Sequence, residues 1–170
     1  RSRGLGDVYK RQLKYLSFEV MNYCGEKYMI STAILGATGV IGQELIIALQ
    51  NHPWYEITKV AASKRSAGKK YKKAITDEEG SLSWYCDEYP NDEILNMKVE
   101  EVSEFDPKSV DVIFTALESD VSKSLEPKLA KIKPVISTAS AFRYEKDVTV
   151  SVSYTHLRAN ETEAERVCRL

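Results

Sequence analysis

Glycines recur every third residue in the segment Gly36-Ala37-Thr38-Gly39-Val40-Ile41-Gly42. Between a strand and a helix, such a segment turns tightly enough to bring backbone N–H groups against a phosphate, and the helix N-terminus adds a partial positive charge. The GxxGxxG spacing departs from the GxGxxG fingerprint of dinucleotide-binding folds, and glycine turns also connect strands to helices where nothing binds. We predict a pyrophosphate-binding loop whose candidate contacts are Gly36, Thr38, Gly39, Val40 and Ile41.

A second candidate site is the basic segment Ser63-Lys64-Arg65-Ser66-Ala67-Gly68-Lys69-Lys70. Folds that bind NAD usually place Asp or Glu at the end of the second strand, where the carboxylate holds the ribose 2'-hydroxyl. Here the hydroxyls of Ser63 and Ser66 and the guanidinium of Arg65 suit a 2'-phosphate instead. The alternative is a basic loop that is merely solvated. We predict NADP as the cofactor in preference to NAD.

Hydrophobic periodicity predicts the elements that would position both loops. Ile30–Leu35 has the pattern of a buried strand, and the β-branched residues of Glu56–Ala62 indicate a second strand. Between them, Val40–Gln50 has the spacing of a helix, which Asn51-His52-Pro53 ends. Strand, glycine loop, helix and strand make one βαβ unit. The apolar face expected for this helix consists of Val40, Ile41, Leu45, Ile46, Ala48 and Leu49.

Further strands are predicted beyond the second loop. Residues 64–80 are polar and rich in Lys and Gly, so no regular structure is predicted there. Apolar runs then predict strands at Met97–Val102, Val110–Ala116 and Pro134–Ser137.

The last predicted helix spans Asp120–Ile132, and Pro127 is expected to kink or restart it. Its apolar face would consist of Val121, Leu125, Leu129 and Ile132. Because strands alternate with helices throughout, the fold class is α/β, Rossmann-like, with a mostly parallel sheet and helices on both faces.

Composition narrows the class of function. The 170 residues suit one ordinary domain. Because 24 Lys and Arg balance 25 Asp and Glu, for a net charge of -1, neither nucleic acid nor a membrane is an expected partner. The apolar runs are shorter than the roughly 20 residues that cross a bilayer, which predicts a cytoplasmic protein. Cys24, Cys86 and Cys168 form no CxxC pair, so neither a disulfide framework nor a metal site is expected.

The two ends of the chain differ from its middle. Arg3–Gln12 and Val152–Thr162 resemble peptides that arise when sequencing-adaptor DNA is translated, and genuine terminal extensions are the alternative. We interpret residues 1–28 as a non-native leader and residues 150–170 as a non-native tail, and leave both out of the fold prediction. The cofactor-binding domain is then expected to span residues 29–149.

Four segments, in this order, resemble one enzyme family: Ala33–Gly42, Ala62–Tyr71, Phe114–Leu117 and Ser137–Arg143. They are similar to aspartate-semialdehyde dehydrogenase of the archaeal and fungal branch. The resemblance implies the N-terminal NADP-binding part of an enzyme that converts aspartyl 4-phosphate to aspartate 4-semialdehyde with NADPH, toward lysine, methionine and threonine. It also implies a small-molecule substrate, a homo-oligomer at full length, and truncation here before the substrate and dimerisation domain.

The resemblance also implies roles for residues outside the two loops. Ala116 and Leu117 would lie against the cofactor at the end of a central strand, and Arg143 would hold the substrate phosphate. Thr138 stands where the family commonly has Asn, which leaves the contacts at that position open. The family's catalytic Cys and His follow the segment where the resemblance ends. No catalytic residue is therefore assigned, and the chain as written is expected to lack dehydrogenase activity.

Two other interpretations stay open. The lobe could belong to an enzyme similar to malonyl-CoA reductase, which shares this branch of the fold and its cofactor loop. It could instead be a non-catalytic module that binds NADP. The positions that would separate these functions follow the segment that resembles the family.

Overall fold

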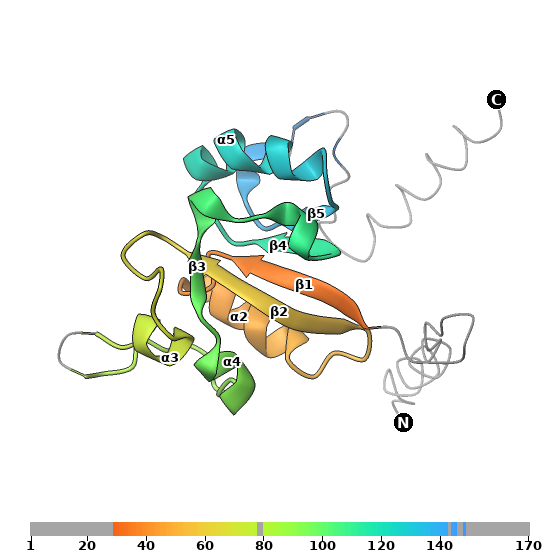
Figure 1. Ribbon diagram of the computed structural model, residues 1–170. Coiled ribbons are helices and arrows are strands. Elements are labelled where there is room, and N and C mark those ends of the chain that lie inside the picture. Colours follow the sequence, from red (N-terminus) through yellow and green to blue (C-terminus); the bar gives the residue numbers. More distant parts are fainter. Residues whose placement is uncertain (1–28, 78–79, 143, 146–147, 149–170) are drawn as a thin grey trace, which may run out of the picture.

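The computed structural model describes residues 29–77, 80–142, 144, 145 and 148. At its centre is a five-stranded sheet in the order β3-β2-β1-β4-β5, and every neighbouring pair of strands is parallel. From the central strand β1 the chain moves outward to β3 and then returns to β4 on the other side of β1 (Figure 1). This arrangement confirms the predicted Rossmann-like fold. The strands are β1 (Ile30–Leu35), β2 (Tyr55–Ala62), β3 (Val99–Glu101), β4 (Val112–Thr115) and β5 (Val135–Ser137).

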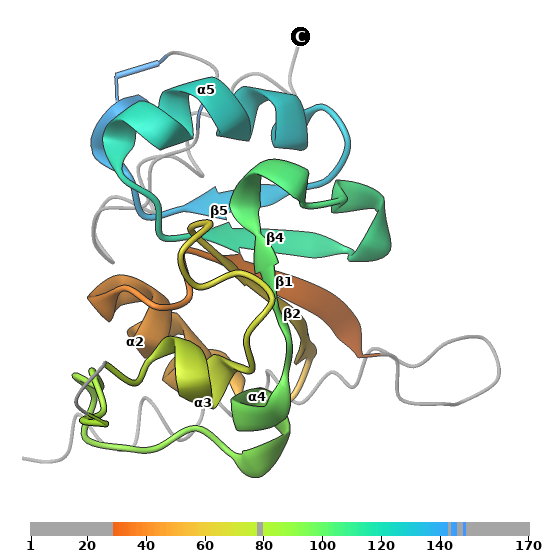
Figure 2. The ribbon, with the colours of Figure 1, turned by 60° about the vertical axis from the view of Figure 1, so that its left-hand side comes forward.

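Helices cover both faces of the sheet, as predicted. One face carries α2 (Val40–Leu49), α3 (Tyr71–Ala74) and α4 (Asp92–Asn96). The opposite face carries α5 (Ser119–Ala130), as Figures 1 and 2 show. Among the described residues, no helix has the length and apolar character needed to cross a membrane. Single-turn 3-10 helices are η1 (Val102–Glu104), η2 (Pro107–Ser109) and η3 (Ser140–Phe142).

Side chains of the central strand alternate between two hydrophobic cores, one on each face of the sheet. Ile34 of β1 enters the core that α2 covers with Ile46, whereas its neighbours Ala33 and Leu35 enter the core that contains Leu129 of α5. The polar side chains of β1 are engaged within the protein, since the hydroxyl of Ser31 donates to Asp111 and that of Thr32 to the Glu56 carbonyl. Binding chemistry is therefore left to the loops at the strand ends.

The segment 64–80 contains a regular element that the sequence analysis did not predict. Helix α3 begins at Tyr71, whose side chain is completely buried, and Ile75 just after the helix is buried as well. The prediction of no regular structure was therefore wrong here, because one aromatic side chain anchors a lysine-rich stretch in the core. Helix α4 was also not predicted, and the side chain of Asn91 caps it by accepting from the N–H of Ile94 at 3.0 Å.

Helix α2 is confirmed, but part of its predicted apolar face is wrong. Val40 and Ile41 are 49% and 51% exposed, whereas the buried residues are Gly42, Gln43, Ile46 and Leu49. Because a helix turns by roughly 100° per residue, Val40 lies on the side away from Gly42. The two exposed apolar residues are thus in the first helical turn, directly after the glycine loop.

Helix α5 is confirmed too, and its predicted apolar face is right in part, because Leu129 is buried and Leu125 packs against the same core. Ser122 and Glu126 are buried, whereas Val121 is 43% exposed and Ile132, beyond the helix end, is 48% exposed. A carboxylate can face the core here because hydroxyl groups surround it, as shown below. The helix runs through Pro127 without restarting.

Candidate dinucleotide-binding site

The carboxyl ends of three adjacent strands lie level at one edge of the sheet. Leu35 of β1 is paired with Ala61 of β2 and with Thr115 of β4. Backbone contacts continue past these ends: the N–H of Gly36 donates to the Ala61 carbonyl at 2.8 Å, and the N–H of Ala116 donates to the Leu35 carbonyl at 2.8 Å. The glycine loop, the start of the basic loop and the segment after β4 are therefore neighbours, at the edge where open α/β sheets bind ligands.

At two of the three loop glycines there is no room for a Cβ atom. Gly36 has φ +84°, and a Cβ atom there would lie 2.3 Å from the Ala116 carbonyl oxygen. A Cβ atom on Gly42 would lie 2.2 Å from the Gly36 carbonyl oxygen, because the helix packs directly on the turn. At Gly39 the nearest atom would be 3.5 Å away, an ordinary contact. The loop is thus a close approach of three backbone segments that only glycine permits.

The start of α2 has the properties of an anion site. Gly39 is the N-cap residue and supplies no side-chain cap, and the first turn contains no acidic residue. The first N–H groups of a helix have no acceptor within the helix, and this end carries a partial positive charge. The exposed Val40 and Ile41 are the first residues of the helix. A negatively charged group can therefore approach these N–H groups.

The basic loop, residues 63–70, turns immediately after β2. The N–H groups of Ser66 and Ala67 donate to the Ser63 carbonyl at 2.9 and 3.2 Å. Ser63 and Arg65 are exposed, whereas Ser66 is only 5% exposed. Of the three residues predicted to contact a 2'-phosphate, two are open to a ligand and the third is nearly covered.

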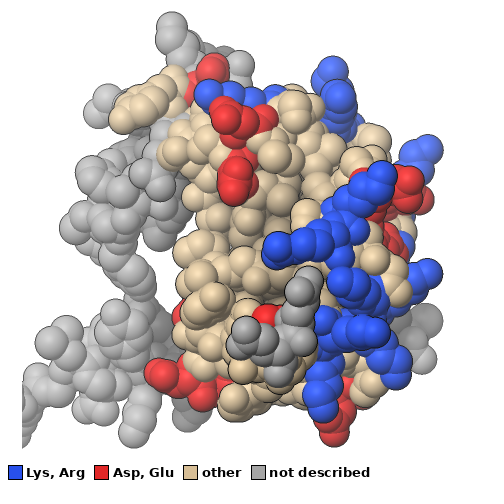
Figure 3. All heavy atoms as spheres, turned by 90° about the vertical axis from the view of Figure 1, so that its left-hand side faces the viewer, with Lys and Arg blue, Asp and Glu red and all other residues tan. Residues whose placement is uncertain are grey.

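Positive charge is concentrated beside this loop. Between residues 63 and 76 there is no Asp or Glu, and β2 ends at Ala62 without a carboxylate. Figure 3 shows Lys and Arg side chains gathered in one band on the face that carries this segment. Carboxylates are present on the neighbouring strand β3, where Glu101 is paired with Ala62 and Glu100 forms an ion pair with Lys59 at 2.8 Å. The excess of positive charge in residues 63–76 still favours a 2'-phosphate. The exposed cationic residues of the segment are Lys64, Arg65, Lys69, Lys70, Lys72 and Lys73.

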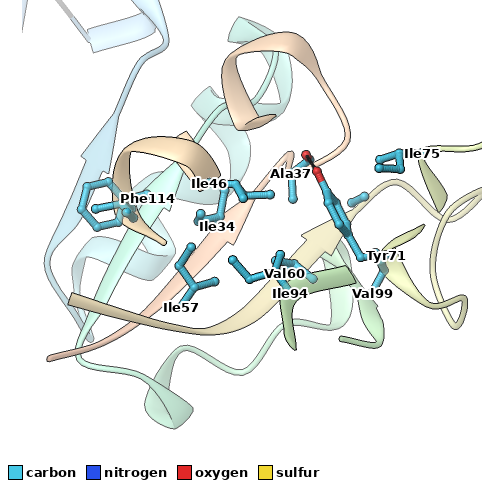
Figure 4. Packing of buried hydrophobic residues seen from close by; sticks show 12 residues of the cluster. Ile34, Ala37, Ile46, Ile57, Val60, Tyr71, Ile75, Ile94, Val99 and Phe114 are labelled. Carbon is cyan, nitrogen blue, oxygen red and sulfur yellow. Dashed lines mark hydrogen bonds between the residues drawn. The ribbon is translucent and has the colours of Figure 1, made fainter. Parts of the chain in front are cut away.

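Two buried side chains hold carbonyl groups of the glycine loop. The hydroxyl of Tyr71 donates to the Ala37 carbonyl at 2.7 Å (Figure 4), and Nε2 of Gln43 donates to the Thr38 carbonyl at 3.2 Å. Burial raises the pKa of Tyr71 well above its usual range, so its hydroxyl keeps its proton and stays a donor. Neither residue was predicted as part of the site. Two features of the sequence could have indicated them. Gln43 is a polar residue at a buried position of α2, and Tyr71 is a single aromatic residue between lysines.

The segments after β4 and β5 contain the remaining predicted contacts. Ala116 and Leu117 are partly buried, and both lie within contact distance of the position that a side chain on Gly36 would occupy. Thr138 donates its N–H and its hydroxyl to the Thr115 carbonyl, at 3.0 and 3.1 Å, so it joins the ends of β4 and β5. Arg143 lies outside the described residues.

A buried carboxylate lies behind these strand ends. Glu126 of α5 is 4% exposed, and its Oε1 accepts from the hydroxyls of Thr115 at 2.7 Å, Ser137 at 2.9 Å and Ser122. The hydroxyls supply the hydrogen bonds that a buried carboxylate requires. The cluster joins α5 to the ends of β4 and β5.

The described cysteine and histidine do not form a nucleophile and base pair. Burial, together with the nearby carboxylates of Glu44 and Asp87, raises the pKa of the Cys86 thiol, which disfavours the reactive thiolate. His52 follows α2, and its Nδ1 accepts from the N–H of Trp54 at 3.2 Å, which is a structural role. Cys24, Cys168 and His156 lie outside the described residues.

Comparison with known proteins identifies similar chains. The sequence pattern described as semialdehyde dehydrogenase, NAD binding domain, matches residues 31–162. The chain is 40% identical over 124 residues to the aspartate-semialdehyde dehydrogenase of Methanothermobacter thermautotrophicus, which covers 73% of this chain and 34% of that relative. The enzyme of the same name from Archaeoglobus fulgidus is 38% identical over 125 residues, covering 72% and 34%.

A solved structure shares the fold. The aspartate semialdehyde dehydrogenase with NADP from Candida albicans matches with a TM-score of 0.65 and 34% sequence identity, over 81% of this chain and 38% of that chain. The chain thus spans about a third of the length of the relatives that it matches.

Proposed function

The chain belongs to the semialdehyde dehydrogenase family through its NAD-binding domain, and from this premise we propose that it is the NADP-binding lobe of an aspartate-semialdehyde dehydrogenase. One observation carries the proposal. A glycine loop at an open helix N-terminus and a carboxylate-free basic loop with an exposed Arg65 lie at neighbouring ends of β1 and β2. The match to the Candida albicans enzyme with NADP supports the same cofactor.

The residues present fit NADP at two separate places. The N–H groups of Thr38, Val40 and Ile41 would receive the pyrophosphate, because the helix start is positive and uncapped. Gly39 would border it through its backbone, since its own N–H donates to the Gly36 carbonyl at 3.1 Å. Ser63 and Arg65 would hold the 2'-phosphate, with a smaller contribution from the nearly buried Ser66. Ala116 and Leu117 would border the cofactor at the end of β4.

In the proposed whole enzyme, NADPH supplies hydride for reduction of aspartyl 4-phosphate to aspartate 4-semialdehyde, a reaction of amino-acid biosynthesis. The described part of this chain would bind and orient the cofactor at the sheet edge. We assign the substrate phosphate to Arg143, because the segment Ser137–Arg143 resembles the family at this position and a planar guanidinium suits bidentate phosphate binding.

We also propose that the 170-residue chain alone binds NADP without turning it over. The raised pKa of Cys86 supports this assignment, since a thiolate is needed to attack an acyl group. The test combines an NADP titration with an assay in which aspartate semialdehyde, phosphate and NADP are mixed with the purified chain. The same assay is repeated on a variant in which Cys24, Cys86 and Cys168 are Ser.

The expected result is saturable NADP binding with no appearance of NADPH in either protein. Absence of NADP binding would overturn the proposed function itself. Steady NADPH formation that disappears in the cysteine-free variant would overturn only the proposed inactivity, and would identify one of the three cysteines as the nucleophile.

A further inference from the structure

We propose that Tyr71 and Gln43 are positioning residues that keep the glycine loop in the conformation that presents its N–H groups to the cofactor pyrophosphate. The inference rests on the proposed NADP binding. Neither side chain is assigned a contact with the cofactor, because both are completely buried. Their effect on binding is exerted through the carbonyl groups of Ala37 and Thr38.

Tyr71 fixes the first of these peptide groups. Ala37 is completely buried, its N–H donates to the Ala61 carbonyl at 3.1 Å, and its carbonyl accepts from the Tyr71 hydroxyl at 2.7 Å. In a trans peptide the C=O and the following N–H point in opposite directions. With the Ala37 carbonyl directed toward Tyr71 in the core, as Figure 4 shows, the N–H of Thr38 is directed away from the core.

Gln43 fixes the next peptide group from inside α2. Its Nε2 donates to the Thr38 carbonyl at 3.2 Å and to the Ser83 carbonyl at 2.8 Å, and its Oε1 accepts from the N–H of Tyr85 at 2.9 Å. The amide is therefore held from both ends and cannot easily release the loop. The Thr38 carbonyl directly precedes the N-cap Gly39, so its direction sets the start of the helix.

The direction of these peptide groups decides whether the loop attracts or repels an anion. If the Ala37–Thr38 peptide group rotated, its carbonyl oxygen would face the phosphate in place of the Thr38 N–H, and attraction would become repulsion. The N–H of Gly39 donates to the Gly36 carbonyl at 3.1 Å, so Gln43 acts on the site by holding the turn that begins the helix. Tyr71 also directly follows the basic loop in the sequence. It therefore joins the segment assigned to the 2'-phosphate to the loop assigned to the pyrophosphate.

The experiment separates positioning from general stability by using three ligands. NADP engages both proposed subsites, NAD lacks the 2'-phosphate, and adenosine 2'-monophosphate lacks the pyrophosphate. Each is titrated against the 170-residue chain and against Tyr71→Phe, which removes one oxygen and keeps the buried ring. Tyr89→Phe is the matched control, because Tyr89 is 65% exposed. Gln43→Met tests the neighbouring carbonyl if Tyr71→Phe does not fold.

Loss of one buried hydrogen bond should weaken NADP and NAD binding by the same factor, roughly 3- to 10-fold, in Tyr71→Phe. Binding of adenosine 2'-monophosphate should not change, and Tyr89→Phe should match the parent for all three ligands. Unchanged NADP affinity in a folded Tyr71→Phe or Gln43→Met variant would overturn the inference, as would equal weakening of all three ligands. A parent chain that binds neither dinucleotide would overturn the proposed function together with it.

Discussion

The two loops at the carboxyl edge of the sheet are built in opposite ways. The glycine loop is enclosed: Ala37 is completely buried, and side chains on Gly36 or Gly42 would collide with backbone. The basic loop is open, with Ser63 and Arg65 exposed and no Asp or Glu between residues 63 and 76. They follow neighbouring strands, yet one offers backbone groups in a fixed shape and the other offers charged side chains.

Because of this difference, we expect the two loops to recognise different parts of the cofactor. A backbone site depends on shape, so a change there alters the whole loop and affects every ligand that carries a pyrophosphate. A side-chain site depends on charge, so a change there is graded and affects only ligands that carry the 2'-phosphate. We therefore predict that variants of the glycine loop weaken binding of both dinucleotides, whereas variants of the basic loop weaken binding of NADP alone.

The largest effect is expected for Gly42→Ala. The helix propensity of Ala favours this variant by about 1 kcal/mol. The Cβ atom, however, would lie 2.2 Å from the Gly36 carbonyl oxygen, and overpacking against rigid backbone costs about 3 kcal/mol. The clash should dominate, lowering the free energy of unfolding in denaturant titrations and abolishing measurable NADP binding. Gly39→Ala is the matched control for stability, and a similar loss of unfolding free energy in both variants would contradict the steric explanation.

A similar loss of stability, without the loss of NADP binding, is expected for Glu126→Leu, behind the strand ends. Leu cannot accept the hydroxyls of Thr115, Ser122 and Ser137, and buried donors without an acceptor destabilise by roughly 2–3 kcal/mol in total. The preference for NADP over NAD should stay as in the parent, because neither loop is touched. A changed preference, measured by titrating both dinucleotides, would show that this cluster belongs to recognition.

The smallest effect is expected for the outer lysines. Lys72→Ala should weaken NADP binding by about twofold or less, because an exposed cation is strongly screened by water and salt. Its matched control is Lys128→Ala on α5, which should show no change. Titrations at low and high salt would measure the difference. An effect of Lys72→Ala as large as that of removing the arginine would mean that the whole basic band binds the phosphate.

Much of this arrangement could be predicted because it depends on local pattern. Apolar periodicity locates β1, α2 and β2, and the glycine spacing locates the loop between them. The buried faces of the helices could not be predicted in the same way. Val40 was assigned to the core although it is exposed, and Glu126 was overlooked although it is buried, because its hydroxyl partners come from β4, β5 and α5.

The same limit applies to the candidate site. Gly36 and Arg65 could be identified from residue type and position alone. Tyr71 and Gln43 could not, because their partners Ala37 and Thr38 are set by the folded loop. A polar residue at a position where the helical pattern expects an apolar one, such as Gln43, is the sequence feature that can indicate a positioning residue.

The division between shape and charge is tested most directly by titrating NADP and NAD against the parent chain and Arg65→Ala. The parent should bind NADP at least about tenfold more tightly than NAD, since a charge-assisted phosphate contact contributes that much or more. Arg65→Ala should weaken NADP binding by roughly 10- to 150-fold and leave NAD binding unchanged. Equal affinities of the parent for the two dinucleotides, or an unchanged NADP affinity in Arg65→Ala, would contradict the assignment of the basic loop to the 2'-phosphate.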